Sequence, residues 1–399
     1  MFRIFYANKD ATLYEGATST NALSVTNTGL DELLEVGKYL ANDGNTLLKS
    51  RCIVQFDMQE IQSALQTYSA DLNNCKFILQ LFTTQAQNLP SDYTIDAKVV
   101  AQPWINGTGT LNSSPIVSNG VQWAKPYASW SLDNTSGSLW ISSSQQLQVT
   151  GTSLYVSGSG AGGSWLWQSG SGFFNISNFN QVFFAQPGLD VNESFSYRTT
   201  DINMDVTDAI KLWISGSSGQ TIANNGFILK FSDADESNTT ITGRIKFYSR
   251  ETHTIYVPKL TMYFDNTTFT TGSLTQADLE SYVVYTQLKP QYKDTEIAKI
   301  RIYARAKYPQ KSPTNLFPIE TVNYLPDTTY YAVFDALTDE AIIPYDNIYN
   351  KVSCDGTSNF IYIDMNGFMP ERYYRLELKI VDGFTEQYVN DQIYFKVVR

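Results

Sequence analysis

The residues whose types could support chemistry gather between positions 201 and 265, which contain the only histidine, His253. A Ser-His-Asp triad would have to use His253, and it would also need a nucleophile and an orienting group at the same site. No G-x-S-x-G elbow occurs near it. We therefore expect no catalytic residue here and a non-enzymatic protein.

Three aspartates in the same stretch, Asp201, Asp205 and Asp208, could supply the carboxylate pair of a glycoside hydrolase. The spacing of Asp205 and Asp208 is also that of a helix start, where carboxylates interact favourably with the N-terminal end of the helix dipole. This favours a capping role, with Ile210 and Trp213 on the buried face of a short helix. A polysaccharide-degrading enzyme stays an alternative, which requires two facing carboxylates in a groove.

A second acidic group, Asp233, Asp235 and Glu236, lies between two predicted strands. Oxygen-rich loops can bind calcium, so these residues are the metal-ligand candidates of the chain. The loop lacks the alternating ligands and the glycine of a known calcium loop, which favours a solvated turn. No cofactor is expected, because the chain has neither a Walker loop nor a dinucleotide fingerprint.

Aromatic residues offer a different kind of site, a surface that binds a partner or a ligand. The candidates are Trp165, Trp167, Phe173, Phe174, Tyr373 and Tyr374. Trp165 and Trp167 are two residues apart and would face the same side of an extended segment. Large exposed apolar patches mark either subunit interfaces or ligand surfaces, and both interpretations remain open. Tyrosines in the C-terminal third would add amphipathic contact area.

The composition predicts an all-β fold to position these residues. The 399 residues include 26 Tyr and 22 Phe, whereas charged residues make up only 17%. Aromatic and β-branched side chains suit a pleated, half-buried surface, and Asn, Gly and Ser suit the turns that connect its strands. The length predicts two or three domains.

Strand patterns and turn signals divide the chain into three expected parts. Residues 1–49 are poor in core-forming periodicity, so we expect an N-terminal arm that reaches a neighbouring molecule. Residues 50–268 are expected to form the first full β domain, with a long decorated insertion at 130–198. Residues 280–399 contain short strands separated by Asp-Gly and Asn-Gly turns, which predict an Ig-like, tyrosine-rich β-sandwich.

Charge and cysteine content limit the expected partners. The net charge of −11 argues against a nucleic-acid surface, which requires clustered Lys and Arg. No apolar run is long enough to span a membrane, and the N-terminus does not read as a signal peptide. The three cysteines, Cys52, Cys75 and Cys354, form no C-x-x-C pair and are expected to be buried free thiols.

The first domain resembles the DNRLRE-type β-sandwich over roughly residues 45–265. The matching positions are 50–57, 101–104 with Gly107 and Gly109, Trp123 with Trp130, 205–208 with Trp213, 225–230, and 247–251 with 258–260. The resemblance implies a jelly-roll-like sandwich. This chain departs from the family pattern at 130–190, where it has an expanded Gly/Ser/Trp-rich region.

The whole chain looks like virion structural proteins of large tailed bacteriophages. The segments that carry this resemblance in the C-terminal part are 306–309, 367–374 and 395–399. The resemblance implies a virion protein of the neck, tail ring, collar or baseplate, whose partners are its own copies and other virion proteins. The alternative is a carbohydrate-binding module of a fibre or adhesin that recognises host-surface glycans, since jelly rolls also occur as lectins.

Overall fold

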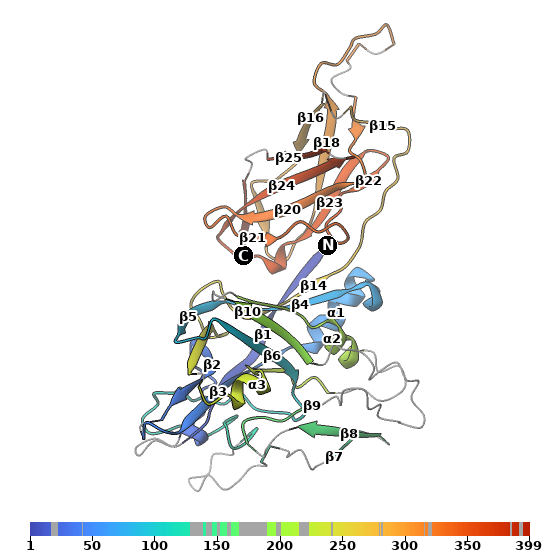
Figure 1. The fold of residues 1–399 in the computed structure, drawn as a ribbon. Helices are drawn as coiled ribbons and strands as arrows, with labels where there is room; N and C mark the ends of the chain where they lie inside the picture. The colour runs from blue at the N-terminus through green and yellow to red at the C-terminus, as the bar shows by residue number, and fades with distance from the viewer. Residues whose placement is uncertain are drawn as a thin grey trace. The chain divides into compact units, whose positions relative to one another are not determined.

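The computed structural model describes residues 1–399 apart from 17–22, 42, 128–138, 141–145, 150–151, 158–160, 167–189, 197–200, 215–222, 241, 279, 281, 315, 318–320, 384 and 391–393. The protein is an all-β sandwich with several sheets, as the composition predicted (Figure 1). Its contacts divide it into two compact units. The N-terminal unit comprises Phe5–Gln66 and Lys76–Thr261, and the C-terminal unit comprises Met1–Ile4, Thr67–Cys75 and Met262–Arg399.

The N-terminal unit is built on an eleven-stranded sheet. Its strands are β1 Phe2–Tyr14, β2 Leu33–Leu40, β3 Leu47–Phe56, β4 Lys76–Leu81, β5 Thr83–Gln87, β6 Asp92–Val99, β10 Asp190–Ser196, β11 Ile202–Asp205, β12 Phe227–Phe231, β13 Gly243–Tyr248 and β14 Lys259–Tyr263. The main path runs in the order β10-β6-β12-β3-β1-β14-β4-β11. Strand β2 joins it through β3, and β13 pairs with both β2 and β5.

The structure corrects the prediction of a separate arm over residues 1–49. Strand β1 lies in the middle of the sheet, where Ala11 pairs with Ile53, and β2 pairs with β3 and β13. The hydrophobic pattern of β1 does not predict a buried strand, because its polar residues Asp10 and Thr12 are almost completely buried. Thr12 is satisfied by Thr28, which accepts a hydrogen bond from the Thr12 N–H and donates one to the Thr12 carbonyl.

Three short α-helices accompany the strands in the described part of the chain: α1 Met58–Tyr68, α2 Thr207–Ile214 and α3 Asp233–Ser237. None of the helices there is long and apolar enough to cross a membrane. Helix α2 confirms the predicted capping role of Asp205, whose Oδ1 accepts hydrogen bonds from the N–H and hydroxyl of Thr207. Ile210 and Trp213 are buried, as expected for the inner face of this helix.

In the expected insertion at 130–198, the described residues include a small sheet of β7 Gln146–Val149, β8 Thr152–Ser157 and β9 Trp165–Leu166. They also include β10, which pairs with β6 and so belongs to the main sheet. Residue Trp165 also forms an isolated bridge with Val100, at the end of β6. Most of the rest of residues 130–198 lies outside the described residues.

The C-terminal unit contains two six-stranded sheets. The first comprises β15 Thr275–Gln276, β16 Tyr282–Thr286, β18 Ile297–Ala306, β19 Asn323–Tyr324, β22 Ser353–Asp355 and β23 Ser358–Asp364. The second comprises β17 Gln291–Lys293, β20 Thr329–Asp335, β21 Ala341–Ile343, β24 Tyr373–Asp382, β25 Thr385–Val389 and β26 Tyr394–Val398. Alternate residues of β18 and β24 are buried, so each sheet presents one face to the core. The longest segment of this unit starts at Met262, whereas the sequence placed the boundary between 268 and 280.

Candidate functional site

Trp165 lies in the core of the N-terminal unit, which corrects its expected place on an exposed surface. Its side chain is only 7% exposed and packs in a cluster with Trp104, Trp123 and Trp140. The Arg51 guanidinium lies 5.0 Å from the ring of Trp123 and 5.3 Å from that of Trp165, at cation–π distance. Trp165 is therefore occupied by intramolecular contacts. Trp167, Phe173 and Phe174 lie outside the described residues.

The acidic group of α3 is engaged by two buried cations instead of forming an open calcium loop. Arg51 binds Glu236 through Nε and Nη2 at 2.9 and 2.7 Å. Lys230, whose side chain is fully buried, lies 2.7 Å from Asp233 and 3.3 Å from Glu236. Burial alone would raise the pKa of Glu236, but the charges of Arg51 and Lys230 outweigh it and lower that pKa.

The third acid of this group, Asp235, accepts hydrogen bonds from the Thr94 N–H and the Ser232 hydroxyl. All three calcium candidates thus serve as structural acceptors. No group of three His, Cys, Asp or Glu that could hold a metal ion occurs in the part of the chain that the structure describes.

The other chemistry candidates also have ordinary structural surroundings. The side chain of His253 is 91% exposed, and its nearest acidic partner is Glu32 at 3.7 Å. Asp201 accepts a hydrogen bond from the Thr83 N–H, and Asp205 caps α2. These contacts account for the aspartates as turn and cap residues.

The two tyrosines proposed as a contact surface are consecutive residues of β24, so their side chains point to opposite faces of the sheet. Tyr374 is 2% exposed, donates a hydrogen bond to the Met369 carbonyl and packs against Phe368 at 4.6 Å between ring centroids, so its expected surface role is wrong. Tyr373 points to the opposite face of the strand and is 56% exposed. Only one of the pair is therefore available to a partner.

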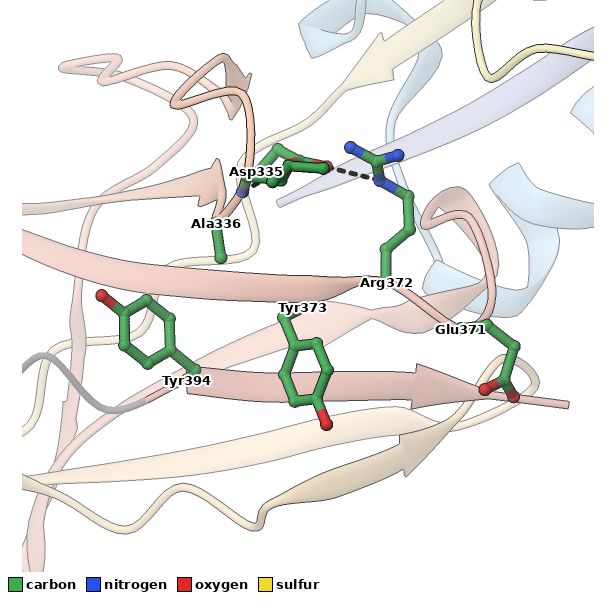
Figure 2. Close-up of a pocket in the computed structure, with 7 residues that line it drawn as sticks. Asp335, Ala336, Glu371, Arg372, Tyr373 and Tyr394 are labelled. Atoms are coloured by element: carbon green, nitrogen blue, oxygen red, sulfur yellow. Dashed lines mark hydrogen bonds and ion pairs between the residues drawn. The ribbon is translucent and has the colours of Figure 1, made fainter.

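Tyr373 opens onto a pocket of about 550 Å³ in the C-terminal unit (Figure 2). Its lining residues are Asp335, Ala336, Leu337, Glu371, Arg372, Tyr373 and Tyr394. They come from the end of β20 and the turn after it, from the start of β24 and the residues before it, and from the start of β26. The volume lies within the range of ordinary ligand pockets.

Asp335 fixes the first wall of the pocket. Its Oδ1 accepts hydrogen bonds from the N–H groups of Leu337 and Thr338, which shape the turn after β20. Its Oδ2 accepts one from Arg372 Nε at 2.7 Å, drawn as the dashed line in Figure 2. Burial would raise the pKa of Asp335, but these hydrogen bonds and the Arg372 charge lower it. The turn leaves the Leu337 side chain 85% exposed.

The second wall comes from the pairing of β24 with β26. Tyr373 pairs with Lys396 and Arg375 pairs with Tyr394, so the two tyrosines are diagonal neighbours on one face of the sheet. Lys396 lies 5.9 Å from the Tyr373 ring and forms an ion pair with Glu371. The Glu371 hydrogen bond raises the pKa of Lys396. Both phenol rings thus lie on a framework of paired strands.

The pocket has the chemistry of a binding surface. The two carboxylates of its lining are already ion-paired, Asp335 with Arg372 and Glu371 with Lys396. The two phenol rings and Leu337 supply apolar contact area. Sequence reasoning missed Asp335, Leu337 and Tyr394 as site residues. The sequence signal that could have indicated the site was Leu337, a large apolar residue in the mostly polar run 335–340. This run directly follows a predicted strand that contains Tyr330 and Tyr331.

Comparisons with known proteins assign neither a family nor a function. No family model and no curated relative matches the chain. The adhesin domain of Epf from Streptococcus pyogenes is similar with 8% identity over 98% of this chain and 91% of that chain, at a TM-score of 0.16. The β-glucuronidase of Parabacteroides merdae matches with 9% identity over 99% of this chain and 36% of that chain, at a TM-score of 0.15. Scores this low carry no argument about this chain.

Proposed function

We propose that this chain is a non-enzymatic assembly protein, which binds other protein chains through the pocket of its C-terminal unit. The observation that supports this is the exposed trio of Leu337, Tyr373 and Tyr394 around an open cavity. Tyrosine is over-represented among the few residues that supply most of the binding energy of a protein interface. These residues lie in well-packed parts of the interface. An exposed apolar cluster of this kind is a contact surface.

The framework under the trio favours tight binding. The Asp335–Arg372 ion pair holds the turn that carries Leu337, and buried Tyr374 anchors the strand that carries Tyr373. Because these supports are already in place, little conformational entropy is lost when a partner binds.

The assembly in this proposal is a phage virion, in which the chain is a repeated component of a neck, tail ring, collar or baseplate. Support comes from the resemblance of residues 367–374 and 395–399 to virion proteins, because the first of these segments contributes Glu371, Arg372 and Tyr373 to the pocket. Its partners are then copies of itself and other virion proteins, with no nucleic acid or membrane involved.

The test combines particle composition with solution behaviour. Mass spectrometry of purified particles should detect the chain at a fixed copy number, and sedimentation of the purified protein should show concentration-dependent association. Leu337→Lys should reduce that association, because it places a charge on the contact surface. A chain that stays monomeric at high concentration and is absent from the particles would overturn the proposal.

A second candidate function is glycan binding, which the ring faces of Tyr373 and Tyr394 favour. Aromatic faces stack on the apolar faces of sugars, and Arg372 and Glu371 line the same cavity with polar groups. A glycan array would show a signal that Tyr373→Ala and Tyr394→Ala abolish. A flat array for the wild-type protein would remove this candidate. Trp165 is buried and is not expected to contact a sugar.

A further inference from the structure

Strand β16 of the C-terminal unit is an edge strand without a charged residue. Its sequence is Tyr-Val-Val-Tyr-Thr, and in the described part of the chain it pairs only with β18. Figure 1 shows it beside β18 at the margin of the unit. An unpaired strand edge presents backbone N–H and C=O groups with which another chain can pair. Strand β16 is therefore a candidate contact surface.

The other described edge strands of this unit are protected. Strand β22 is covered by the chain at 268–270, since Cys354 donates its N–H to the Thr268 carbonyl and accepts from the Thr270 N–H. Strand β25 carries Glu386, which forms an ion pair with Lys379. Strands β15, β17 and β21 have only two or three residues. Very short strands and charged side chains are usual protections of a sheet edge, and β16 has neither.

The register of β16 shows which of its backbone groups face the open edge. Gln287 donates its N–H to the Arg301 carbonyl at 2.8 Å, and Val284 lies opposite Ala304, three residue pairs further along. Hydrogen-bonded and non-hydrogen-bonded pairs alternate in an antiparallel ladder, so Val284 belongs to a non-hydrogen-bonded pair. The N–H and carbonyl of Val284 therefore point away from β18. A partner at this edge must be an extended backbone that accepts one hydrogen bond and donates another.

We infer that β16 pairs antiparallel with β16 of a second copy, across a two-fold axis at Val284. Each Val284 then donates its N–H to the carbonyl of the other, and Val283 of one copy lies opposite Tyr285 of the other. Opposed aromatic and β-branched residues stabilise antiparallel strands. Tyr285 is already held on the outer face of the sheet, because it stacks on Tyr303 at 5.1 Å between ring centroids. The contact is isologous and joins the sheets of two copies into one.

The absence of charge in β16 favours a second copy as the occupant. Like charges directly opposite one another destabilise a strand pair, and β16 meets none when it pairs with itself. The nearest charged residues, Glu280 and Lys289, lie beyond opposite ends of the strand, so this register does not oppose like charges. Lys289 is paired with Glu296 in its own copy, and the contact does not depend on it.

Cysteine cross-linking tests the register of the contact. The three native cysteines are buried, so they do not compete with introduced ones. Val283→Cys mixed with Tyr285→Cys should form a disulfide between copies on air oxidation, because opposite residues of a non-hydrogen-bonded pair have Cα atoms about 4.5 Å apart. Either variant alone should cross-link far less, since the same residue of the two copies is then about 7–8 Å away. A mixture that cross-links no more than the single variants would overturn the inference.

Sedimentation equilibrium separates this contact from the pocket. Leu337→Lys blocks the pocket, and the protein that carries it should remain a dimer. Adding Tyr285→Lys should weaken that dimer at least about tenfold, because it removes two cross-strand aromatic contacts and charges the edge. Ile297→Lys is the matched control, since Ile297 is as exposed as Tyr285, at 44%, but lies at the other end of β18. Circular dichroism should show that every variant is folded.

The outcomes for the two surfaces are distinguishable. A Leu337→Lys protein that is monomeric at all concentrations, or whose dimer Tyr285→Lys leaves unchanged, would overturn the β16 contact and leave the pocket proposal standing. If Leu337→Lys associates as fully as the wild-type protein, the pocket proposal fails, and the effect of Tyr285→Lys still decides the β16 contact.

Discussion

Arg51 and Glu236 form a two-pronged ion pair inside the N-terminal unit, with distances of 2.9 and 2.7 Å and side chains that are 8% and 9% exposed. The Arg51 guanidinium also donates to the Gly162 carbonyl at 2.6 Å, and lies against Trp123 and Trp165. Strand β3 is thereby joined to α3 and to the segment before β9. This contact explains why neither Trp165 nor Glu236 is available to an external ligand.

Glu236→Gln should destabilise the N-terminal unit by about 3–5 kcal/mol, because it leaves Arg51 and Lys230 as buried charges without their shared carboxylate. Urea denaturation followed by tryptophan fluorescence measures the loss. Glu386→Gln is the control, since Glu386 forms an exposed pair with Lys379 and should change stability far less. Equal effects of the two substitutions would contradict the structural role of the buried pair.

Asp10 should make stability fall as pH rises from about 4 to about 7. Burial raises its pKa from 3.8 to about 7, against the opposing effect of the Arg250 N–H that it accepts at 2.6 Å. In this window the folded state holds a proton that the unfolded state has released, so raising the pH favours unfolding. Asp10→Asn removes this group, so the wild-type and variant urea midpoints should diverge between pH 5 and pH 7.5. A constant difference across that range would refute the assignment.

Tyr373 and Tyr374 should respond oppositely to substitution by alanine. Tyr374→Ala creates a cavity beside Phe368 and Phe395 and should cost about 3–5 kcal/mol of unfolding free energy. Tyr373→Ala removes an exposed ring and should change the melting temperature little while it weakens self-association. Thermal melts and sedimentation of the two variants check both halves. Loss of association in Tyr374→Ala without loss of stability would be inconsistent with the burial described above.

Gly226→Ala should destabilise the protein several times more than Gly44→Ala. Both glycines have left-handed backbone, with φ of +81° and +71°, where an alanine costs about 1 kcal/mol. A Cβ at Gly226 would also lie 2.1 Å from the Val54 carbonyl oxygen, whereas nothing lies within 4 Å at Gly44. Denaturation midpoints of the two variants give the comparison. Similar midpoints would mean that β3 yields to the added carbon at little cost.

Local patterns predicted the features that short segments control. The all-β class followed from the composition of the whole chain. The cap at Asp205 with buried Trp213 followed from helix-start spacing, because it depends on neighbours within a few residues. The place of β1 could not be predicted in this way. Its buried Asp10 is stabilised by the Arg250 N–H, which is 240 residues away in the sequence, so the segment looked too polar for a central strand.

The candidate site was predictable only in part. Tyr373 was singled out correctly as exposed, but its neighbour Tyr374 was not distinguished from it, because the face that a strand residue occupies depends on the second sheet. The pocket itself combines the turn at Asp335 with the paired starts of β24 and β26. Their pairing joins residues far apart in the chain, and no short motif encodes such a pairing.

The position of β1 next to β14 also affects how the protein is made. The two strands are neighbours in the sheet, yet β1 ends at Tyr14 and β14 begins at Lys259, which is 245 residues later. At about 5–20 residues per second, the ribosome needs roughly 12–50 s to supply the partner strand. During translation the nascent β1 therefore has one hydrogen-bonding edge without its native neighbour, and an unpaired edge of this kind can pair with another chain.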